Sequence, residues 1–190
     1  MRRVFLVHGW ASTPNGTFFP YLRRELEVRG YEVVGVKLPH PLSPEPVSWV
    51  KALADAVQTP DLETTLVGHS MGGATVLRYL EQLAGMAKVG KVVLVAPVVE
   101  EITGLDEHEE KIAEPWLQHV FQEEQIRASF ESMIAFFSDN DRWIPLSSAK
   151  TLEKRYFANT VVLHERGHFT AEVGDPTREL PEILSAIIGE

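Results

Sequence analysis

Cysteine is absent from this sequence of 190 residues. Its absence excludes disulfide scaffolds, cysteine-ligated zinc, iron–sulfur clusters and a thiol nucleophile, and it fits a reducing compartment. The chain is 44% hydrophobic and 24% charged, close to the averages for globular proteins. We therefore expect one compact domain over residues 1–190 that is held together by a hydrophobic core.

Long apolar runs and basic clusters are also missing. The longest apolar run, Val92 to Val99, is interrupted by Pro97 and falls short of the roughly 18 residues that a membrane helix needs. Arg2 and Arg3 precede only four apolar residues, too few for a signal-peptide core. Lysine and arginine never cluster beyond a pair, and the formal net charge is −9. These features predict a cytoplasmic protein that binds neither membrane nor nucleic acid.

Short apolar runs alternate with longer amphipathic segments along the whole chain, a pattern typical of strands joined by crossover helices. The expected strands are Val4 to Val7, Tyr31 to Val36, Thr64 to Val67, Val92 to Ala96, Met133 to Ser138 and Thr160 to Leu163. The expected helices are Phe19 to Arg29, Val47 to Val57, Gly72 to Leu83, Ser147 to Tyr156 and Pro181 to Ile188. The fold class is therefore expected to be α/β, with a mostly parallel sheet of about six strands and helices on both faces.

The segment Pro97 to Phe130 differs from the rest of the chain in charge. It holds nine acidic residues against Lys111 and Arg127, and so carries −7 of the net charge of −9. We expect short helices here, inserted between the fourth and fifth strands. This insertion begins at the carboxyl edge of the sheet, where open α/β folds place their sites, so it could cover a cleft there. The alternative is a solvated pair of charged helices that aids solubility.

The motif Gly68-His69-Ser70-Met71-Gly72 lies between an apolar run and a segment with helical periodicity. In this strand–turn–helix context a G-x-S-x-G sequence is typical of a nucleophilic serine, because the sharp turn exposes the hydroxyl and the glycines remove Cβ atoms that would clash. We predict that Ser70 is the nucleophile. The alternative is an ordinary glycine-rich turn. His69 is expected to pack or to form a hydrogen bond, since adjacent side chains on so sharp a turn diverge.

A serine hydroxyl needs a histidine to accept its proton and a carboxylate to orient that histidine. His168 lies in a loop beyond the last expected strand, where the preceding glycine gives its ring freedom to reach Ser70. Asp139 and Asp141 both follow the fifth expected strand, and Asp141 is favoured because it closely precedes an apolar anchor and a proline. Asp139 is then expected to form a turn, and His164 to point toward a neighbouring helix or solvent.

These motifs occur in the chain order typical of α/β hydrolases. Over nearly its whole length the chain resembles the small single-domain serine hydrolases of the α/β-hydrolase superfamily, which include the retinoblastoma-binding-protein-9-like and YdeN-like hydrolases. The resemblance rests on His8-Gly9, Gly68-His69-Ser70-Met71-Gly72, Asp141-x-x-Ile144-Pro145 and Gly167-His168-Phe169. It implies a compact α/β-hydrolase fold with Ser70 as nucleophile, Asp141 as orienting acid and His168 as base. It also implies carboxylesterase activity on short acyl esters, although some members are better known as binding partners.

An oxyanion hole needs two N–H donors, of which one belongs to the residue after the nucleophile, here Met71. The second is expected in the loop after the first strand, at His8-Gly9-Trp10, and the resemblance assigns it to the Trp10 N–H. Gly9 would let the backbone approach the substrate closely. An ordinary glycine-containing turn is the alternative for this loop.

Several large aromatic side chains are expected on segments at the carboxyl edge of the sheet. With Gly9 they would line a narrow pocket for a small apolar acyl group. These aromatic residues are Trp10, Phe18, Phe19, Trp116, Trp143 and Phe169. Ordinary core packing is the alternative for each of them.

Metal and cofactor motifs are not convincing. His164 and His168 stand four residues apart with Glu165 between them, but Gly167 and the preceding strand oppose the helix that would present them as ligands. No glycine pattern of the kind that cradles phosphates follows His8-Gly9. We therefore expect neither a metal nor a cofactor.

The sequence thus predicts a serine hydrolase that cleaves small acyl esters through a Ser-His-Asp triad and an acyl-enzyme intermediate. A thioesterase, amidase or peptidase with the same triad is one alternative, since fold and triad do not determine the scissile bond. A protein-interaction module with a vestigial hydrolase site, and hence a protein partner, is the other. The protein is expected to be a monomer or a small homo-oligomer.

Overall fold

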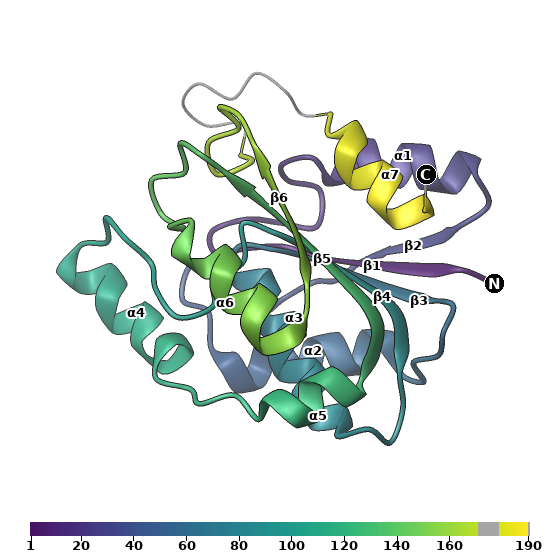
Figure 1. The fold of residues 1–190 in the computed structure, drawn as a ribbon, viewed down its shortest axis with the longest axis horizontal. Coiled ribbons are helices and arrows are strands. Elements are labelled where there is room, and N and C mark those ends of the chain that lie inside the picture. The colour runs from purple at the N-terminus through teal and green to yellow at the C-terminus, as the bar shows by residue number, and fades with distance from the viewer. Residues whose placement is uncertain (171–178, 190) are drawn as a thin grey trace.

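We describe residues 1–170 and 179–189 of a computed structural model of the protein. The described residues form one six-stranded sheet in the order β2-β1-β3-β4-β5-β6, and every neighbouring pair is parallel (Figure 1). The strands are β1 (Arg3–Val7), β2 (Glu32–Gly35), β3 (Thr64–His69), β4 (Val89–Val95), β5 (Phe130–Ser138) and β6 (Asn159–Leu163). The expected α/β class with a parallel sheet is confirmed.

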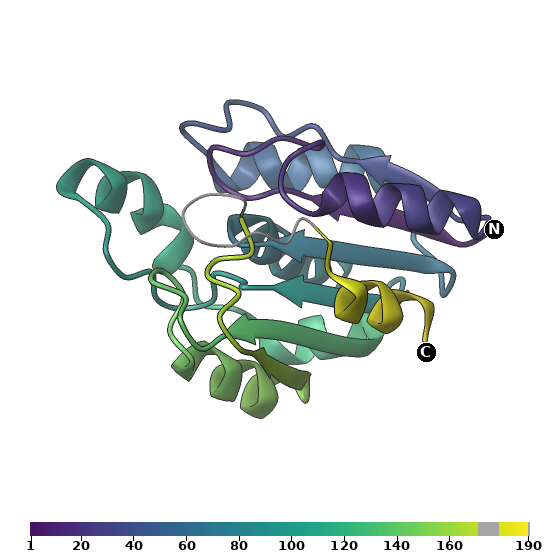
Figure 2. The same cartoon turned by 90° about the horizontal axis from the view of Figure 1, so that it is seen from above.

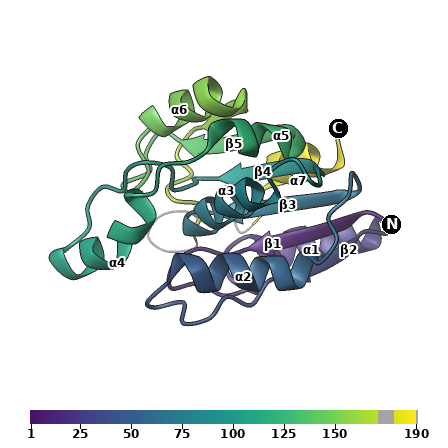
Figure 3. The same ribbon diagram turned by 90° about the horizontal axis from the view of Figure 1, so that it is seen from below.

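Helices cover both faces of the sheet. They are α1 (Phe19–Val28), α2 (Pro46–Val57), α3 (Met71–Leu83), α4 (Glu107–Leu117), α5 (Glu123–Ala128), α6 (Ser147–Tyr156) and α7 (Pro181–Ile188). One face carries α1 and α7, and the other carries α2, α3, α5 and α6 (Figure 3). The acidic segment forms α4 and α5, and α4 stands beyond the carboxyl ends of the strands (Figure 2). Within the described residues, no helix is both long and apolar enough to cross a membrane.

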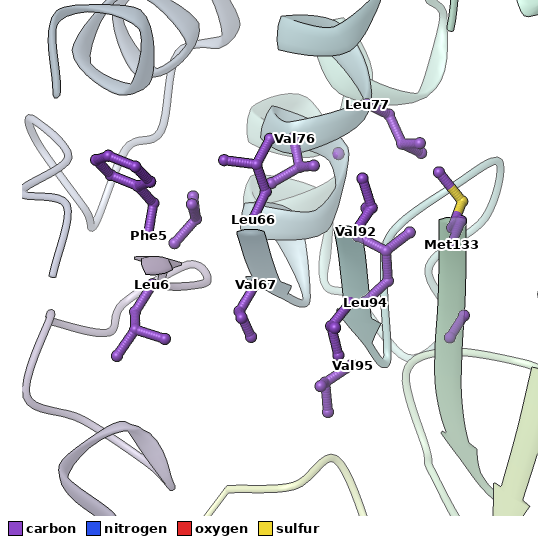
Figure 4. Close-up of a cluster of buried hydrophobic side chains, with 14 of the residues drawn as sticks. Phe5, Leu6, Leu66, Val67, Val76, Leu77, Val92, Leu94, Val95 and Met133 are labelled. Carbon is purple, nitrogen blue, oxygen red and sulfur yellow. The ribbon is translucent and has the colours of Figure 1, made fainter. Parts of the chain in front are cut away.

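The core is built on rows of apolar side chains that run across the sheet. One row joins Phe5, Leu66, Val92 and Met133 at matching register positions of β1, β3, β4 and β5. This row faces Val76 and Leu77 of α3, whereas Leu6 and Val67 point to the other side (Figure 4). All of these side chains are buried, and each stabilises the fold by about 1.5–3 kcal/mol through removal of its apolar surface from water. Burial on both faces explains why the strands lack polar alternation.

The projecting helix α4 is fixed to the domain at its C-terminal end. The Trp116 ring is 5.5 Å from that of Trp49, and its indole N–H donates to the Pro44 carbonyl at 3.1 Å. Arg78 of α3 donates to the Pro115 carbonyl at 2.7 Å. These contacts hold the acidic segment over the carboxyl edge of the sheet, where the site described below lies.

Candidate active site

Ser70 occupies the turn between β3 and α3 in a conformation that few residues adopt. Its φ and ψ are 56° and −123°, a strained combination that costs about 1–3 kcal/mol in a residue with a side chain. Backbone hydrogen bonds hold the turn in place. The Ser70 N–H donates to the Val95 carbonyl at 2.9 Å. The Ser70 carbonyl accepts from the Gly73 N–H at 2.9 Å and from the Val98 N–H at 3.1 Å. The surrounding structure thus imposes the sharp turn that the motif predicts.

Glycines allow three chain segments to meet at this turn. A Cβ atom on Gly72 would lie 2.2 Å from the Val7 carbonyl oxygen, so α3 could not start so close to the end of β1 with any other residue there. A Cβ atom on Gly9 would lie 2.9 Å from the Ser70 Cβ and 3.4 Å from its Oγ. The loop after β1 therefore runs directly against the Ser70 side chain.

Two backbone N–H groups are available beside Ser70. Met71 is the first residue of α3, and the first N–H groups of a helix have no acceptor within it. Trp10 follows Gly9 in the loop that touches Ser70. Among residues 1–170 and 179–189, neither N–H donates to a carbonyl or side-chain acceptor, and both residues line the same cavity as Ser70. Two N–H groups without an acceptor at one cavity are a feature that an oxyanion hole requires.

His168 and Asp141 form a buried pair. The Nδ1 atom of His168 lies 2.8 Å from Oδ2 of Asp141, and their side chains are 9% and 1% exposed. The other carboxylate oxygen accepts from the N–H groups of Trp143 at 2.9 Å and Ile144 at 3.2 Å. With Nδ1 occupied, Nε2 is the ring nitrogen of His168 that remains for chemistry, and His168 lines the cavity together with Ser70.

Asp139 has a different partner. Its Oδ2 lies 2.5 Å from Nδ1 of His164, and its Oδ1 accepts from the Glu165 N–H at 2.8 Å. These hydrogen bonds lower the pKa of Asp139, with the Glu165 N–H as the largest cause, and the bond to Asp139 raises the pKa of His164. The His164 side chain is 79% exposed, so this pair lies at the surface. Of the two carboxylates left open by the sequence, Asp141 is the one that meets His168.

The two remaining histidines near the turn are buried. The Nδ1–H of His8 donates to the Gly9 carbonyl at 2.9 Å, because a carbonyl oxygen only accepts. Burial lowers the pKa of His8, and it lowers the pKa of His69 to about 3, with the neighbouring His168 as a second cause. Both rings are therefore neutral near neutral pH.

A cavity of about 640 Å³ opens beside Ser70 and His168. Gly9, Trp10 and Trp143 line it as expected. Phe18, Phe19, Trp116 and Phe169 are not among the lining residues and are instead 0–2% exposed within the core. For these four, core packing explains the position: Phe18, for example, makes edge contacts with Phe19 and His69.

Part of the cavity wall comes from the acidic segment. Ile102, Leu105 and Ile112 line the cavity, together with His108 and Glu109. Sequence reasoning missed these residues, although apolar positions at helical spacing inside an acidic segment were an available signal. Glu109 is the only carboxylate in the lining of the described residues, and no lysine or arginine is part of it. The other described residues of the cavity wall are apolar or uncharged.

Nothing in the described part of the chain gathers metal ligands. No group of three or more histidine, aspartate or glutamate side chains there is arranged to hold an ion. His164 and His168, the pair with metal-like spacing, each bind a separate aspartate.

The parallel sheet, with a serine turn after β3 and loops converging at its carboxyl edge, defines the fold as that of the α/β hydrolases. Solved structures share it. The ydeN gene product of Bacillus subtilis superposes with a TM-score of 0.87 at 24% identity, covering 100% of both chains. An esterase, RhEst1 from Rhodococcus sp. ECU1013, superposes with a TM-score of 0.69 at 16% identity, covering 98% of this chain and 89% of that one.

The chain belongs to the serine hydrolase family, whose model matches residues 4–186. YdeN of Bacillus subtilis (strain 168), a protein named as a hydrolase, is 27% identical over 173 residues, which are 91% of this chain and 88% of YdeN. Serine hydrolase RBBP9 of Rattus norvegicus is 25% identical over 164 residues, 86% of this chain and 79% of the relative. The resemblance noted in the sequence is thus confirmed: this is a small serine hydrolase of the YdeN and RBBP9 type.

Proposed function

We propose that the protein is a carboxylesterase that uses Ser70, His168 and Asp141 as a catalytic triad. The observation that carries the proposal is the buried pair of His168 and Asp141, whose histidine lines the same cavity as Ser70. A buried carboxylate at Nδ1 keeps the proton on that nitrogen, leaves the lone pair on Nε2, and stabilises the imidazolium that forms when the ring takes a proton.

The reaction proceeds in two halves. The Ser70 Oγ attacks the ester carbonyl while Nε2 of His168 takes its proton. When the tetrahedral intermediate collapses, the bond to the alcohol oxygen breaks, and His168 returns the proton to the leaving alcohol. Water then repeats the sequence on the acyl-enzyme: His168 takes its proton, the oxygen bonds to the acyl carbon, and Ser70 recovers its hydrogen as the acid leaves. The N–H groups of Trp10 and Met71 stabilise the oxyanion in both halves.

The cavity favours an uncharged substrate of modest size. Its volume of about 640 Å³ is within the range of small-molecule sites. Ile102, Leu105 and Trp143 offer apolar surface to an acyl or alkyl group. A substrate carboxylate would find no cation in the described lining and would face Glu109. Short neutral acyl esters are therefore the proposed substrate class.

The test is hydrolysis of p-nitrophenyl esters of increasing acyl length, together with labelling by a fluorophosphonate probe. The Ser70→Ala variant is expected to lose labelling and to lower kcat by about 10³-fold or more, as loss of a triad nucleophile does. Thioester and anilide analogues of the best acyl group establish which scissile bond is preferred. Equal labelling of the parent and of Ser70→Ala, or a parent that cleaves none of these substrates, would overturn the proposal.

A further inference from the structure

The residue just before His168 contributes no side-chain packing to its loop, because it is a glycine. Gly167 has a φ of 53°, in the left-handed region, and a Cβ atom placed on it would meet none of the described residues within 4 Å. Side-chain packing therefore does not hold the backbone just before His168. Catalysis by a base, however, requires a nearly constant distance to the nucleophile, since a displacement of about 1 Å can cost about 10²-fold in rate. Besides the buried Phe169 that follows His168, hydrogen bonds from two other loops supply that constraint.

One such bond comes from His69, the residue directly before Ser70. Its Nε2 lies 2.8 Å from the carbonyl oxygen of His168, across 99 residues of sequence. A carbonyl only accepts, so His69 donates its Nε2–H. The two rings also pack, with centroids 5.0 Å apart. His69 is 2% exposed, which shields this bond from competition by water.

A second bond comes from Asn140, the residue directly before Asp141. Its Oδ1 accepts from the Gly167 N–H at 2.7 Å and from the Ser138 hydroxyl at 2.8 Å. The Ser138 Oγ in turn accepts from the Arg166 N–H at 2.9 Å. The peptide groups just before His168 are thus tied to the loop that carries its carboxylate partner.

The two bonds have a common geometry. The residue before the proposed nucleophile binds the carbonyl of the proposed base, and the residue before the proposed acid binds the N–H of the glycine that precedes this base. We propose that His69 and Asn140 are positioning residues that together hold the His168 imidazole at a constant distance from Ser70. The inference rests on the proposed function, because it assigns their role through the triad. His69 also lines the cavity, whereas Asn140 does not, so in both cases the proposed role acts through His168 and not through contact with the substrate.

The decisive variant is His69→Phe, which keeps a ring of similar size beside Phe18 and removes the N–H donor. We expect kcat to fall about 10- to 100-fold with only a small change in KM, because a ring of similar size still lines the cavity while the base is less well placed. His69→Gln restores a donor and is expected to recover part of the lost kcat. Asn140→Leu is expected to lower kcat in the same way, and Asn140→Asp, which keeps an acceptor oxygen, to lose less.

His164→Phe is the matched control. It makes the same substitution on an exposed histidine of the loop that carries His168, and it is expected to leave kcat within about twofold. All variants are assayed well below their melting temperatures, so that a loss of stability alone does not change kcat. A parent that neither cleaves esters nor takes up the fluorophosphonate probe would overturn the proposed function and this inference together. An active parent whose kcat survives both His69→Phe and Asn140→Leu within threefold would overturn the inference alone. If His69→Phe does not fold, the surface variants Asn140→Leu and Asn140→Asp decide.

Discussion

The Nδ1 atom of His168 lies 2.8 Å from Oδ2 of Asp141, and the Asp141 side chain is only 1% exposed. A carboxylate so far from water needs partners for both oxygens. Asp141 has them: the imidazole at one oxygen and two backbone N–H groups at the other. The pair is therefore a rigid unit at the carboxyl edge of the sheet.

Substitution distinguishes the roles of the two aspartates in the loop after β5. Asp141→Asn places an amide donor against the Nδ1–H of His168 and so favours the wrong tautomer, and we expect kcat to fall by about 10⁴-fold. Asp139→Asn disturbs a surface pair with His164 and should leave kcat within about twofold. Steady-state kinetics with circular dichroism to confirm folding checks both. Comparable losses in the two variants would contradict the assignment of Asp141.

Replacing Gly9 tests the contact between the β1 loop and Ser70. In Gly9→Ala the new Cβ would lie 2.9 Å from the Ser70 Cβ and 3.2 Å from the His69 carbonyl oxygen. The loop must move, so the Trp10 N–H leaves its place beside Ser70. We expect kcat to fall about 10- to 100-fold, since loss of one oxyanion donor costs about 10²–10³-fold and the loop moves only in part.

Gly90→Ala is the control for this variant. Its Cβ would lie 2.0 Å from the Leu62 carbonyl oxygen, at the amino end of β4. The substitution should therefore destabilise the protein by about 1–3 kcal/mol through overcrowding. The variant should keep the kcat of the parent at a temperature where it is folded. Thermal unfolding and kcat are measured for both. A Gly9→Ala enzyme with full kcat would show that this loop is not part of the site.

The buried His69 makes stability depend on pH. Its pKa in the folded state is about 3, against 6.5 for the free side chain. Between these pH values the unfolded chain binds a proton that the folded chain does not. The contribution of His69 to the free energy of unfolding is therefore fully present above about pH 6.5 and is lost as the pH drops toward 3. The loss is at most about 1.4 kcal/mol per pH unit for this group.

His69→Phe removes this titration. Urea unfolding at about pH 7 and about pH 5 should therefore show a smaller acid-induced loss of stability in the variant than in the parent. His8, whose pKa is also lowered by burial, leaves a residual slope in both proteins. An acid-induced loss that is unchanged or larger in His69→Phe would contradict the buried, neutral state of this ring.

The charge of the cavity wall predicts discrimination between esters. An ester whose acyl chain ends in a carboxylate should have a kcat/KM about 10-fold below that of its neutral isostere, because the lining formed by residues 1–170 and 179–189 holds Glu109 and no cation. Glu109→Gln should reduce this ratio, and so should salt, which screens the repulsion. Glutamine still serves in the capping box at the start of α4, so the helix should persist.

Glu110→Gln, on the exposed side of α4, is the control. An equal ratio in the parent, in Glu109→Gln and in Glu110→Gln would contradict a role for Glu109.

Much of the fold was predictable because it depends on local patterns. Apolar runs of strand length and amphipathic segments of helical period located the strands and helices, with small differences at their ends: β4 begins at Val89 and β5 at Phe130, each three residues earlier than expected. The aromatic pocket was predicted less well. Trp10 and Trp143 line the cavity, but Trp116 is used to fix α4, because a large aromatic residue looks the same in sequence whether it packs in a core or faces a cavity.

The sequence by itself determined the order of strands and helices, the sharp turn at Ser70 and the set of histidines and aspartates from which a base and an acid can be drawn. Periodicity and glycine spacing act over a few residues, so these features need no knowledge of distant contacts. Only the tertiary structure decided that Asp141 meets His168 while Asp139 meets His164. It also decided that His69 and Asn140 form hydrogen bonds with the loop that carries His168. Those choices depend on how loops 25–99 residues apart in sequence come together at one edge of the sheet, and the hydrogen-bonding side chains carry no local signal of which partner they will reach.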